Sequence, residues 1–472
     1  MPPQYSQRCL ASIDRVARIP LIWCVAVTLL LASAYAQVRW SYVDTAVNLS
    51  AAADTRSWRE LASDALTKSV EYRPMLDLST RLAYRLLGLN LRAYQAMVVV
   101  EFALLLVMLV LLFRPTGRAR AIAAVVALSV AVGLHTSRIL FLFVPLNAYA
   151  AALLLVMGTA LLVLTPRLRR FEWVFLPLTF IALMWLELGV LIVPMVIVAW
   201  WIKAPGTTWR SAAAVSAAFA LYLWARLGPG PGLGGMNSPD TGFGFSNLSQ
   251  ADSAALFGTM PWLFWIYNVG STVMTVLASE PRAGTFRFVY ALKTGSVPVW
   301  MWLHVVSSIA TTAVVFGALP GIRARPHRDR VIVALGAVLI LAGSALAFLY
   351  TRDRIGLAAG FGYAMLVYVG FTALLERQGQ GSRRLAAVTL VAVLGLCWSI
   401  RTVEMYTALR DTAWDYHLEW NREDARAAAA QSPIVARMRD AAVAHRPASA
   451  EHDPIWTYRL FERRFEPAKE AP

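Results

Sequence analysis

Apolar runs about twenty residues long alternate with short clusters of arginine along almost the whole sequence. A helix needs roughly 20 apolar residues to cross the hydrocarbon core of a bilayer, and several runs reach that length. Of the 472 residues, 58% are hydrophobic and only 15% are charged. Soluble domains are about one quarter charged. The sequence therefore predicts an all-α, polytopic transmembrane protein.

The basic residues are spread along the chain rather than gathered into one patch. The formal net charge is +16, but a nucleic-acid-binding protein concentrates such charge on one face or tail, so no nucleic-acid partner is expected. Short basic clusters between apolar runs are instead typical of loops on the cytoplasmic side of a membrane. The three cysteines lie in apolar runs or in the basic N-terminal tail, so no disulfide is expected.

Six basic clusters determine the topology that we expect. If all six lie in the cytoplasm, every stretch between two clusters crosses the membrane an even number of times, which gives about eleven crossings. The N-terminus is then cytoplasmic and the C-terminus extracytoplasmic. The high Ala and Arg content and the short cytoplasmic loops indicate a bacterial inner membrane, with the endoplasmic reticulum as the alternative. The clusters are Arg8/Arg15/Arg18, Arg114/Arg118/Arg120, Arg167/Arg169/Arg170, Lys203/Arg210, Arg323/Arg325/Arg328/Arg330 and Arg377/Arg383/Arg384.

Two pairs of consecutive crossings are expected to form hairpins. Residues 171–202 are predicted to turn at Glu187, because one helix of 32 residues would be about 48 Å long. The first run is expected to stay as a helix rather than to be cleaved as a signal peptide. Segment 255–279 is predicted to be an interfacial or re-entrant helix. The expected crossings are 20–37, 93–113, a hairpin over 121–164, the hairpin over 171–202, 211–226, 298–320, 331–350, 357–375 and 386–400.

The predicted crossings divide the chain into two parts. Residues 1–400 form the transmembrane domain, with large extracytoplasmic loops over 38–92 and 227–297. Residues 401–472 are expected to form an extracytoplasmic helical tail.

The first outer loop begins with VRWSYVDTAVNLS, in which Asp44 follows the first apolar run by a few residues. A carboxylate at the membrane surface, close to aromatic side chains, suits a general base that takes a proton from a hydroxyl group. The alternative is that Asp44 is a helix N-cap or a solvated acid.

A second feature of this loop is an amphipathic helix predicted to begin at Pro74 and to end before Gly88. Its leucines recur every three or four residues on one face, and its charges lie on another. Such a helix is expected to lie along the membrane surface, with a simple amphipathic connector as the alternative. Glu71 and Arg73 precede its N-terminus, where a phosphate and a sugar could meet the helix dipole.

Three segments resemble one family of membrane enzymes. The segments are EYRPMLDLSTRLAYRLLGLNLRAYQAMVVVEFALLLVMLVLL, FIALMWLELGVLIVPMVIVAWW and YTRDRIGLAAGFGYAML. They are similar to the first-loop region, the hairpin and the late-helix segment of the GT-C superfamily of polyprenyl-phosphate-sugar-dependent glycosyltransferases. The resemblance is nearest to the O-mannosyltransferase branch with tetratricopeptide tails. It implies a hexosyl- or pentosyltransferase whose partners are a polyprenyl-phosphate-sugar donor, membrane lipids, and a carbohydrate, lipid or protein acceptor.

The chain departs from the family pattern at two places. Where many members have two adjacent acids, it has Asp44 followed by Thr45, so a divalent Mg or Mn ion is left open as a cofactor. The family's Ser-Lys before the hairpin glutamate is also missing at Glu187.

Transfer of a sugar from a lipid phosphate needs a base for the acceptor hydroxyl and cations for the departing phosphate. Asp44 is the expected base. Glu187 could instead be an interface-exposed acid, and His135 a structural hydrogen-bonding residue. The expected phosphate ligands are Arg73, Arg138, Arg352 and Arg354, and the expected lining residues are Glu71, Tyr72, His135 and Glu187.

Two other classes of membrane protein compete with this interpretation. A transporter or flippase would show repeated halves and broken helices with polar residues near the membrane midplane. A polymerase or ligase of lipid-linked glycans would also carry arginine-rich outer loops, and a non-catalytic scaffold is a further alternative.

Overall fold

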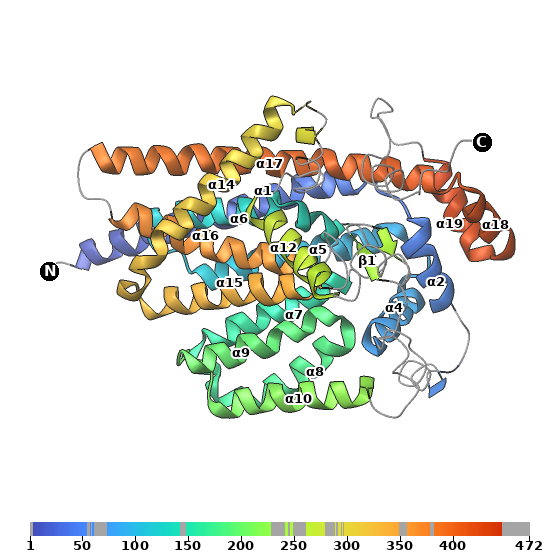
Figure 1. Cartoon of the computed structure of the whole chain (residues 1–472), viewed down its shortest axis with the longest axis horizontal. Helices are drawn as coiled ribbons and strands as arrows, with labels where there is room; N and C mark the ends of the chain where they lie inside the picture. The colour runs from blue at the N-terminus through green and yellow to red at the C-terminus, as the bar shows by residue number, and fades with distance from the viewer. Residues whose placement is uncertain are drawn as a thin grey trace.

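The computed structural model describes residues 3–53, 73–141, 148–227, 261–278, 297–348, 356–377 and 382–445, with short stretches at 57, 59–60, 241–243, 246–248, 288, 291–293 and 295. Figure 1 shows helices running along the long axis of the molecule, with the start of α1 at one end. Shorter helices gather at the other end, where α2, α4, α18 and α19 lie.

Five helical segments of the described part of the chain are long and apolar enough to cross a membrane. A sixth is a bent pair, α6 (Arg118–Gly133) and η2 (His135–Phe141), with an angle of 72° between its halves. The chain is therefore an integral membrane protein, and the eleven crossings remain a prediction. The five are Arg18–Tyr35 of α1 (Pro3–Tyr35), α5 (Leu91–Phe113), α14 (Val299–Ala318) with η6 (Leu319–Ala324), α16 (Leu357–Arg377) and α17 (Ser382–Glu419).

The remaining helices complete the bundle. The centre of the core is α16, which is buried along nearly its whole length and packs against α6, α14 and α15. The predicted interfacial segment contains α12 (Pro261–Leu277), which packs against α15 and α16. The others are α7 (Ala148–Val163), η3 (Pro166–Val174), α8 (Phe175–Trp185), η4 (Glu187–Leu191), α9 (Ile192–Trp201), α10 (Trp209–Leu227) and α15 (His327–Ala345).

One short hairpin departs from the predicted all-α fold. Strands β1 (Thr241–Phe243) and β2 (Ser246–Leu248) pair antiparallel, with Gly242 opposite Asn247. They lie in the predicted second outer loop. Everything else that is regular in the described part of the chain is helical, so the all-α prediction is confirmed there apart from these six residues.

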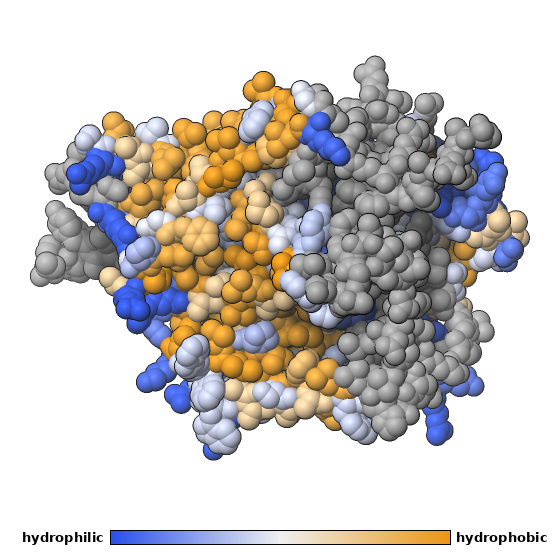
Figure 2. All heavy atoms as spheres, in the orientation of Figure 1, coloured by the Kyte–Doolittle hydropathy of each residue, from blue (hydrophilic) through white to orange (hydrophobic). Residues whose placement is uncertain are grey.

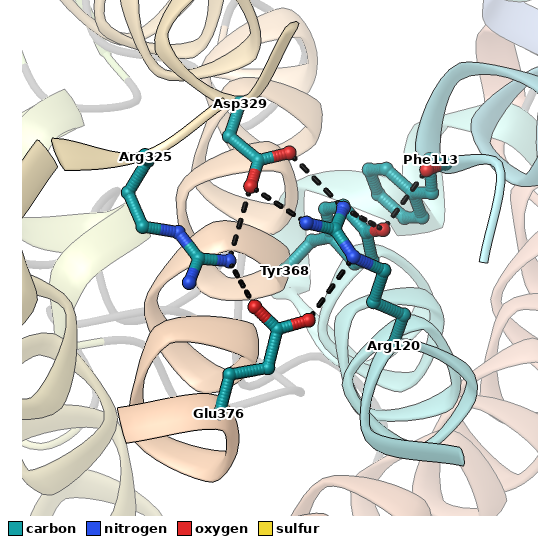
Figure 3. Close-up of polar contacts among 6 residues, drawn as sticks. All are labelled: Phe113, Arg120, Arg325, Asp329, Tyr368 and Glu376. Carbon is teal, nitrogen blue, oxygen red and sulfur yellow. Dashed lines mark hydrogen bonds and ion pairs between the residues drawn. The ribbon is translucent and has the colours of Figure 1, made fainter. Parts of the chain in front are cut away.

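Basic residues from separate clusters meet at one end of the bundle (Figure 3). Asp329 receives two hydrogen bonds from Arg120, at 2.9 and 3.1 Å, and one from Arg325 at 3.0 Å. Glu376 bridges the same two arginines, at 3.1 Å from Arg120 and 2.7 Å from Arg325. Tyr368 extends the network by donating to the Phe113 carbonyl at 2.9 Å. This network joins the start of α6, the end of α5, the start of α15 and the end of α16.

Two more contacts bring further clusters to the same place. Arg328 donates to the carbonyls of Leu112 and Leu164, which end α5 and α7, at 2.6 and 3.4 Å. His327 lies 3.1 Å from the carbonyl of Lys203, just after α9. We call this end of the bundle the arginine end. Residues of three clusters lie there, together with Leu164 and Glu376, which are close in sequence to two more. The clusters thus share one end, as the parity argument requires, while the membrane side that this end faces remains a prediction.

Helices that start at the arginine end finish at the opposite end of the bundle, which we call the site end. It contains the end of α1, because Gln95 near the start of α5 donates to the Tyr35 and Val38 carbonyls at 3.0 and 2.7 Å. It also contains η2, which follows α6. The short elements that come after α1, before α5 and after α17 in the chain also lie at this end. They are η1 (Tyr42–Ala46), α2 (Val47–Ala52), α4 (Pro74–Leu87), α18 (Glu423–Gln431) and α19 (Pro433–Val443).

The surface between the two ends is apolar. Figure 2 shows hydrophobic residues in a broad band, with hydrophilic residues gathered at the end that lies on the left. Large exposed apolar side chains include Leu29, Leu104, Leu221, Val306 and Leu396, on five different helices. Lipid-facing helices present such a surface, since the bilayer interior is as apolar as these side chains.

The apolar segment over 171–202 is broken as predicted, and the break lies at Leu186, directly before the predicted turn residue Glu187. Leu186 has extended backbone angles between α8 and η4. Both ends of the hairpin lie at the arginine end. Val163 precedes the hairpin and Gly206 follows it, and the Gly206 amide donates to the Val163 carbonyl at 2.8 Å. The tip at Glu187 therefore points toward the site end.

Candidate functional site at the end opposite the arginine clusters

Asp44 lies in η1, a five-residue π-helical segment that follows the first candidate span. Its backbone is placed, but its side chain lies outside the described residues. Next to it, Thr45 is buried and its hydroxyl lies 2.8 Å from that of Ser41. Single π-helical turns are rare and occur frequently at functional sites. The segment predicted to carry the base thus has an unusual backbone.

The segment around Asp44 is held by the C-terminal part of the chain. The Trp420 indole donates to the Trp40 carbonyl at 2.7 Å, and Glu419 accepts from the Tyr42 amide at 2.9 Å. The rings of Tyr42 and Trp420 are 5.5 Å apart, edge to face. These partners are about 380 residues away in sequence. The residues after 400, predicted to be an outer tail, therefore contact and stabilise the segment that carries Asp44.

Arg73 and Glu187, both predicted site residues, form an ion pair. Arg73 Nη2 lies 2.9 Å from Glu187 Oε2, and Arg73 Nε lies 3.3 Å from Oε1. This is the bidentate geometry that makes arginine–carboxylate pairs strong. Their side chains are 24% and 33% exposed. Pro74 and Gly88 begin and end α4 as predicted, which places Arg73 at the helix N-terminus.

Arg138 and His135 both lie in η2, beyond the bend after α6. Arg138 donates to the Thr412 hydroxyl at 2.7 and 3.2 Å, and its Nη2 is 3.8 Å from Asp415 Oδ2. His135 is 1% exposed. The arginine predicted to bind phosphate therefore contacts α17, and its role as a phosphate ligand stays a prediction.

Four other predicted site residues cannot be compared with the structure. Glu71, Tyr72, Arg352 and Arg354 lie outside the described residues. Their assignments as lining residues and phosphate ligands remain predictions.

Sequence reasoning missed Arg39 and Arg92, which meet near the start of this site. Both donate to the Ala36 carbonyl, at 3.4 and 3.0 Å. Among the described residues neither pairs with a carboxylate. Burial and then the nearby Arg92 lower the pKa of the Arg39 guanidinium. The available signal was their position, since one follows the first apolar run and the other opens the second.

Burial, Arg39 and Arg92 also lower the pKa of the His445 imidazole, at the end of the described C-terminal segment. Arg39 lies five residues before Asp44, and neither it nor Arg92 has a carboxylate partner in the part of the chain that the structure describes, so the two guanidiniums are suited to binding an anion.

A second missed group lies inside the bundle between α14 and α17. Arg401 is fully buried and donates to the hydroxyls of Ser307 and Ser308 at 2.7 and 2.8 Å. Its guanidinium lies 3.9 Å from the Trp398 ring centroid. Near it, His304 Nε2 is 3.1 Å from Glu404 Oε1. The sequence offered little signal, because residue 401 directly follows an apolar run and was assigned to the tail.

A metal ion has no complete set of ligands in the described part of the chain. No group of three or more His, Cys, Asp or Glu residues there is arranged to hold one. At the position of the family's second acid, Thr45 offers a hydroxyl that already contacts Ser41. A divalent Mg or Mn ion is therefore left open as a cofactor, as it was from the sequence.

The fold and the apolar band define a helical integral membrane protein with polar clusters at both ends of its bundle. Comparisons with protein-family models, curated proteins and solved structures found no match.

Proposed function

We propose that the chain is a membrane glycosyltransferase of the GT-C type. It transfers a sugar from a polyprenyl-phosphate donor to a hydroxyl of a glycan, lipid or protein on the extracytoplasmic side. The observation that carries the proposal is the position of Asp44, on a π-helical turn at the membrane exit of α1. The Tyr42 amide at the start of this turn donates to Glu419 of α17, and Gln95 of α5 donates to the Val38 carbonyl just before the turn.

The proposed chemistry is a single substitution at the sugar. The acceptor oxygen forms a bond to the anomeric carbon, and the bond from that carbon to the phosphate oxygen breaks. The Asp44 carboxylate takes the proton of the acceptor hydroxyl. The electron pair of the broken bond stays on the phosphate, which leaves as polyprenyl phosphate and gains negative charge.

Guanidinium groups at the site end support this reaction. Arg39 and Arg92 share one carbonyl close in sequence to Asp44, and a phosphate oxygen would be a stronger acceptor than that carbonyl. Preorganised cations that face the departing oxygens stabilise the transition state. Arg73, at the start of α4, is a further candidate if the donor phosphate competes with Glu187 for its guanidinium.

A second candidate, a flippase for a lipid-linked sugar, is favoured by the broken helices. The chain bends by 72° between α6 and η2, and it breaks between α8 and η4. Interrupted helices and buried polar groups such as Arg401 are typical of transporters.

One experiment distinguishes the two candidates. Purified protein is reconstituted into sealed vesicles with a sugar-labelled polyprenyl-phosphate donor and a panel of peptide, oligosaccharide and glycolipid acceptors. The proposal predicts release of polyprenyl phosphate and labelled acceptor. Movement of intact donor between leaflets with no release would support the flippase, and neither outcome in any vesicle would contradict both.

A further inference from the structure

An open pocket of about 480 Å³ lies at the arginine end, far in the chain from the residues of the proposed site. It is formed between η3 and the start of α10. The preceding segments end at Leu164 and Lys203, whose carbonyls contact Arg328 and His327. The lining residues are Arg169, Arg170, Glu172, Thr208, Trp209 and Arg210.

The lining is basic, since it contains three arginines and one glutamate. That carboxylate is already engaged, because Glu172 accepts hydrogen bonds from the hydroxyls of Thr208 and, at 3.4 Å, Ser211. Arg210 is 71% exposed, and its nearest approach to Glu172 is 3.8 Å. Arg169 and Arg170 are exposed as well. The guanidiniums can therefore turn toward a ligand without breaking a close ion pair.

Three exposed tryptophans belong to the pocket or to segments next to it in the chain: Trp209 lines it, Trp173 lies in η3, and Trp201 ends α9. Trp173, Trp201 and Trp209 are 64%, 79% and 63% exposed. Tryptophan is enriched where a membrane meets water, because its ring is amphipathic. The pocket therefore lies at the level of lipid headgroups.

Beyond the indole rings, the helices that carry the pocket expose apolar side chains. Leu176 on α8, Ile197 on α9 and Leu221 on α10 are 46%, 37% and 50% exposed. Because α10 packs against α8 and α9, and η3 contacts α8 and α10, these helices are the ones next to the arginines of the pocket. The site therefore fits an amphiphile with an anionic head and apolar chains.

We propose that this pocket binds the phosphate group of an anionic phospholipid in the adjacent leaflet. The arginines bind the phosphate oxygens through two-pronged hydrogen bonds, which lysine cannot make. The acyl chains lie along α8, α9 and α10. This proposal does not depend on sugar transfer, since none of its residues belongs to the site end.

A free phosphate ion shares the headgroup's chemistry but lacks the chains, so the two sources are separable. The full-length protein in detergent is titrated with phosphatidylglycerol, with phosphatidylcholine, or with inorganic phosphate. Bound lipid is counted by native mass spectrometry. The variant with Arg169→Gln, Arg170→Gln and Arg210→Gln is compared with wild type.

The matched control removes the same charge from the same end of the bundle. It carries Arg323→Gln, Arg383→Gln and Arg384→Gln, three exposed arginines outside the pocket. We expect the pocket variant to bind phosphatidylglycerol at least about tenfold more weakly, and the control to stay within about twofold of wild type. Equal weakening in both variants would overturn the proposal, because the binding would then follow overall charge.

A second measurement on the wild-type protein does not depend on the folding of a variant. Hydrogen–deuterium exchange should slow in peptides covering 166–174 and 204–212 on addition of phosphatidylglycerol and not of phosphatidylcholine. The same protection by inorganic phosphate alone would overturn the assignment to a lipid. No protection by either anion would overturn the site itself.

Discussion

At the scale of single residues, the ion pair of Arg73 and Glu187 shows what sequence reasoning reaches. Each was placed near the site, one from its position before an amphipathic helix and the other from its place at a hairpin tip. Their pairing could not be predicted, because 114 residues separate them. It depends on how α4 packs against α8, which local patterns do not encode.

The ion pair of Arg73 and Glu187 leads to a stability prediction. Glu187→Gln removes the charge and leaves the partly buried Arg73 with weaker bonds. We expect a loss of about 1 to 2 kcal/mol, more than for a typical surface pair. Thermal unfolding of the purified protein measures it.

The control for Glu187→Gln is Asp424→Asn, which weakens the pair of Arg422 and Asp424. That pair has the same kind of geometry at 3.0 Å, but its side chains are 58% and 50% exposed. We expect a loss below about 0.5 kcal/mol. Equal losses in the two variants would contradict this prediction, because the pair of Arg73 and Glu187 would then be no better protected from water than the pair of Arg422 and Asp424.

At the scale of elements, the boundaries of helices with strong signals were predictable. The limits of α4 follow from Pro74 and Gly88, and the break at Glu187 follows from the length of its apolar run. The length of α17 was not predicted. Its apolar run ends at residue 400, but no Gly or Pro lies between Leu396 and Glu419, so the helix continues. Apolarity determines where a span ends, and backbone propensity determines where a helix ends.

The tip of the hairpin formed by α8 and α9 requires a glycine. A Cβ on Gly189 would lie 2.3 Å from the Ala182 carbonyl carbon, so Gly189→Ala must push η4 away from α8. We expect a loss of about 1 to 3 kcal/mol and a weaker contact between Arg73 and Glu187. Gly158→Ala in α7 is the control, since nothing lies within 4 Å of its Cβ position. It should be neutral or stabilising by up to about 1 kcal/mol. A similar loss in both variants, measured by thermal unfolding, would contradict this account of the hairpin.

At the scale of the whole molecule, the spacing of arginine clusters predicted which segments share an end. The network that joins them was not predictable, because its carboxylates come from two helices and bind arginines of a third and of a preceding loop. The Arg325 side chain is 10% exposed and that of Asp329 only 1%. The clusters therefore carry both a topology signal and the packing of one end.

The network at the arginine end predicts unequal effects for its two acids. Asp329→Asn leaves Arg120 and Arg325 to share the single Glu376 carboxylate in a largely buried site, which should cost about 3 kcal/mol or more. Glu376→Gln should cost about 1 kcal/mol, because the Glu376 side chain is 34% exposed and solvent screens its charge. Thermal unfolding of the two variants gives the comparison. A larger loss for Glu376→Gln would contradict this assignment of the buried anchor.

The most direct test of the proposed function is the rate of sugar transfer by Asp44→Asn in reconstituted vesicles. The control is Asp440→Asn, the same substitution at an exposed acid of α19. A general base contributes about 100-fold to 10,000-fold to a rate. We therefore expect Asp44→Asn to lower turnover of the polyprenyl-phosphate donor at least about 100-fold, with Asp440→Asn close to wild type. Equal turnover by wild type and Asp44→Asn would contradict the assignment of Asp44 as the base.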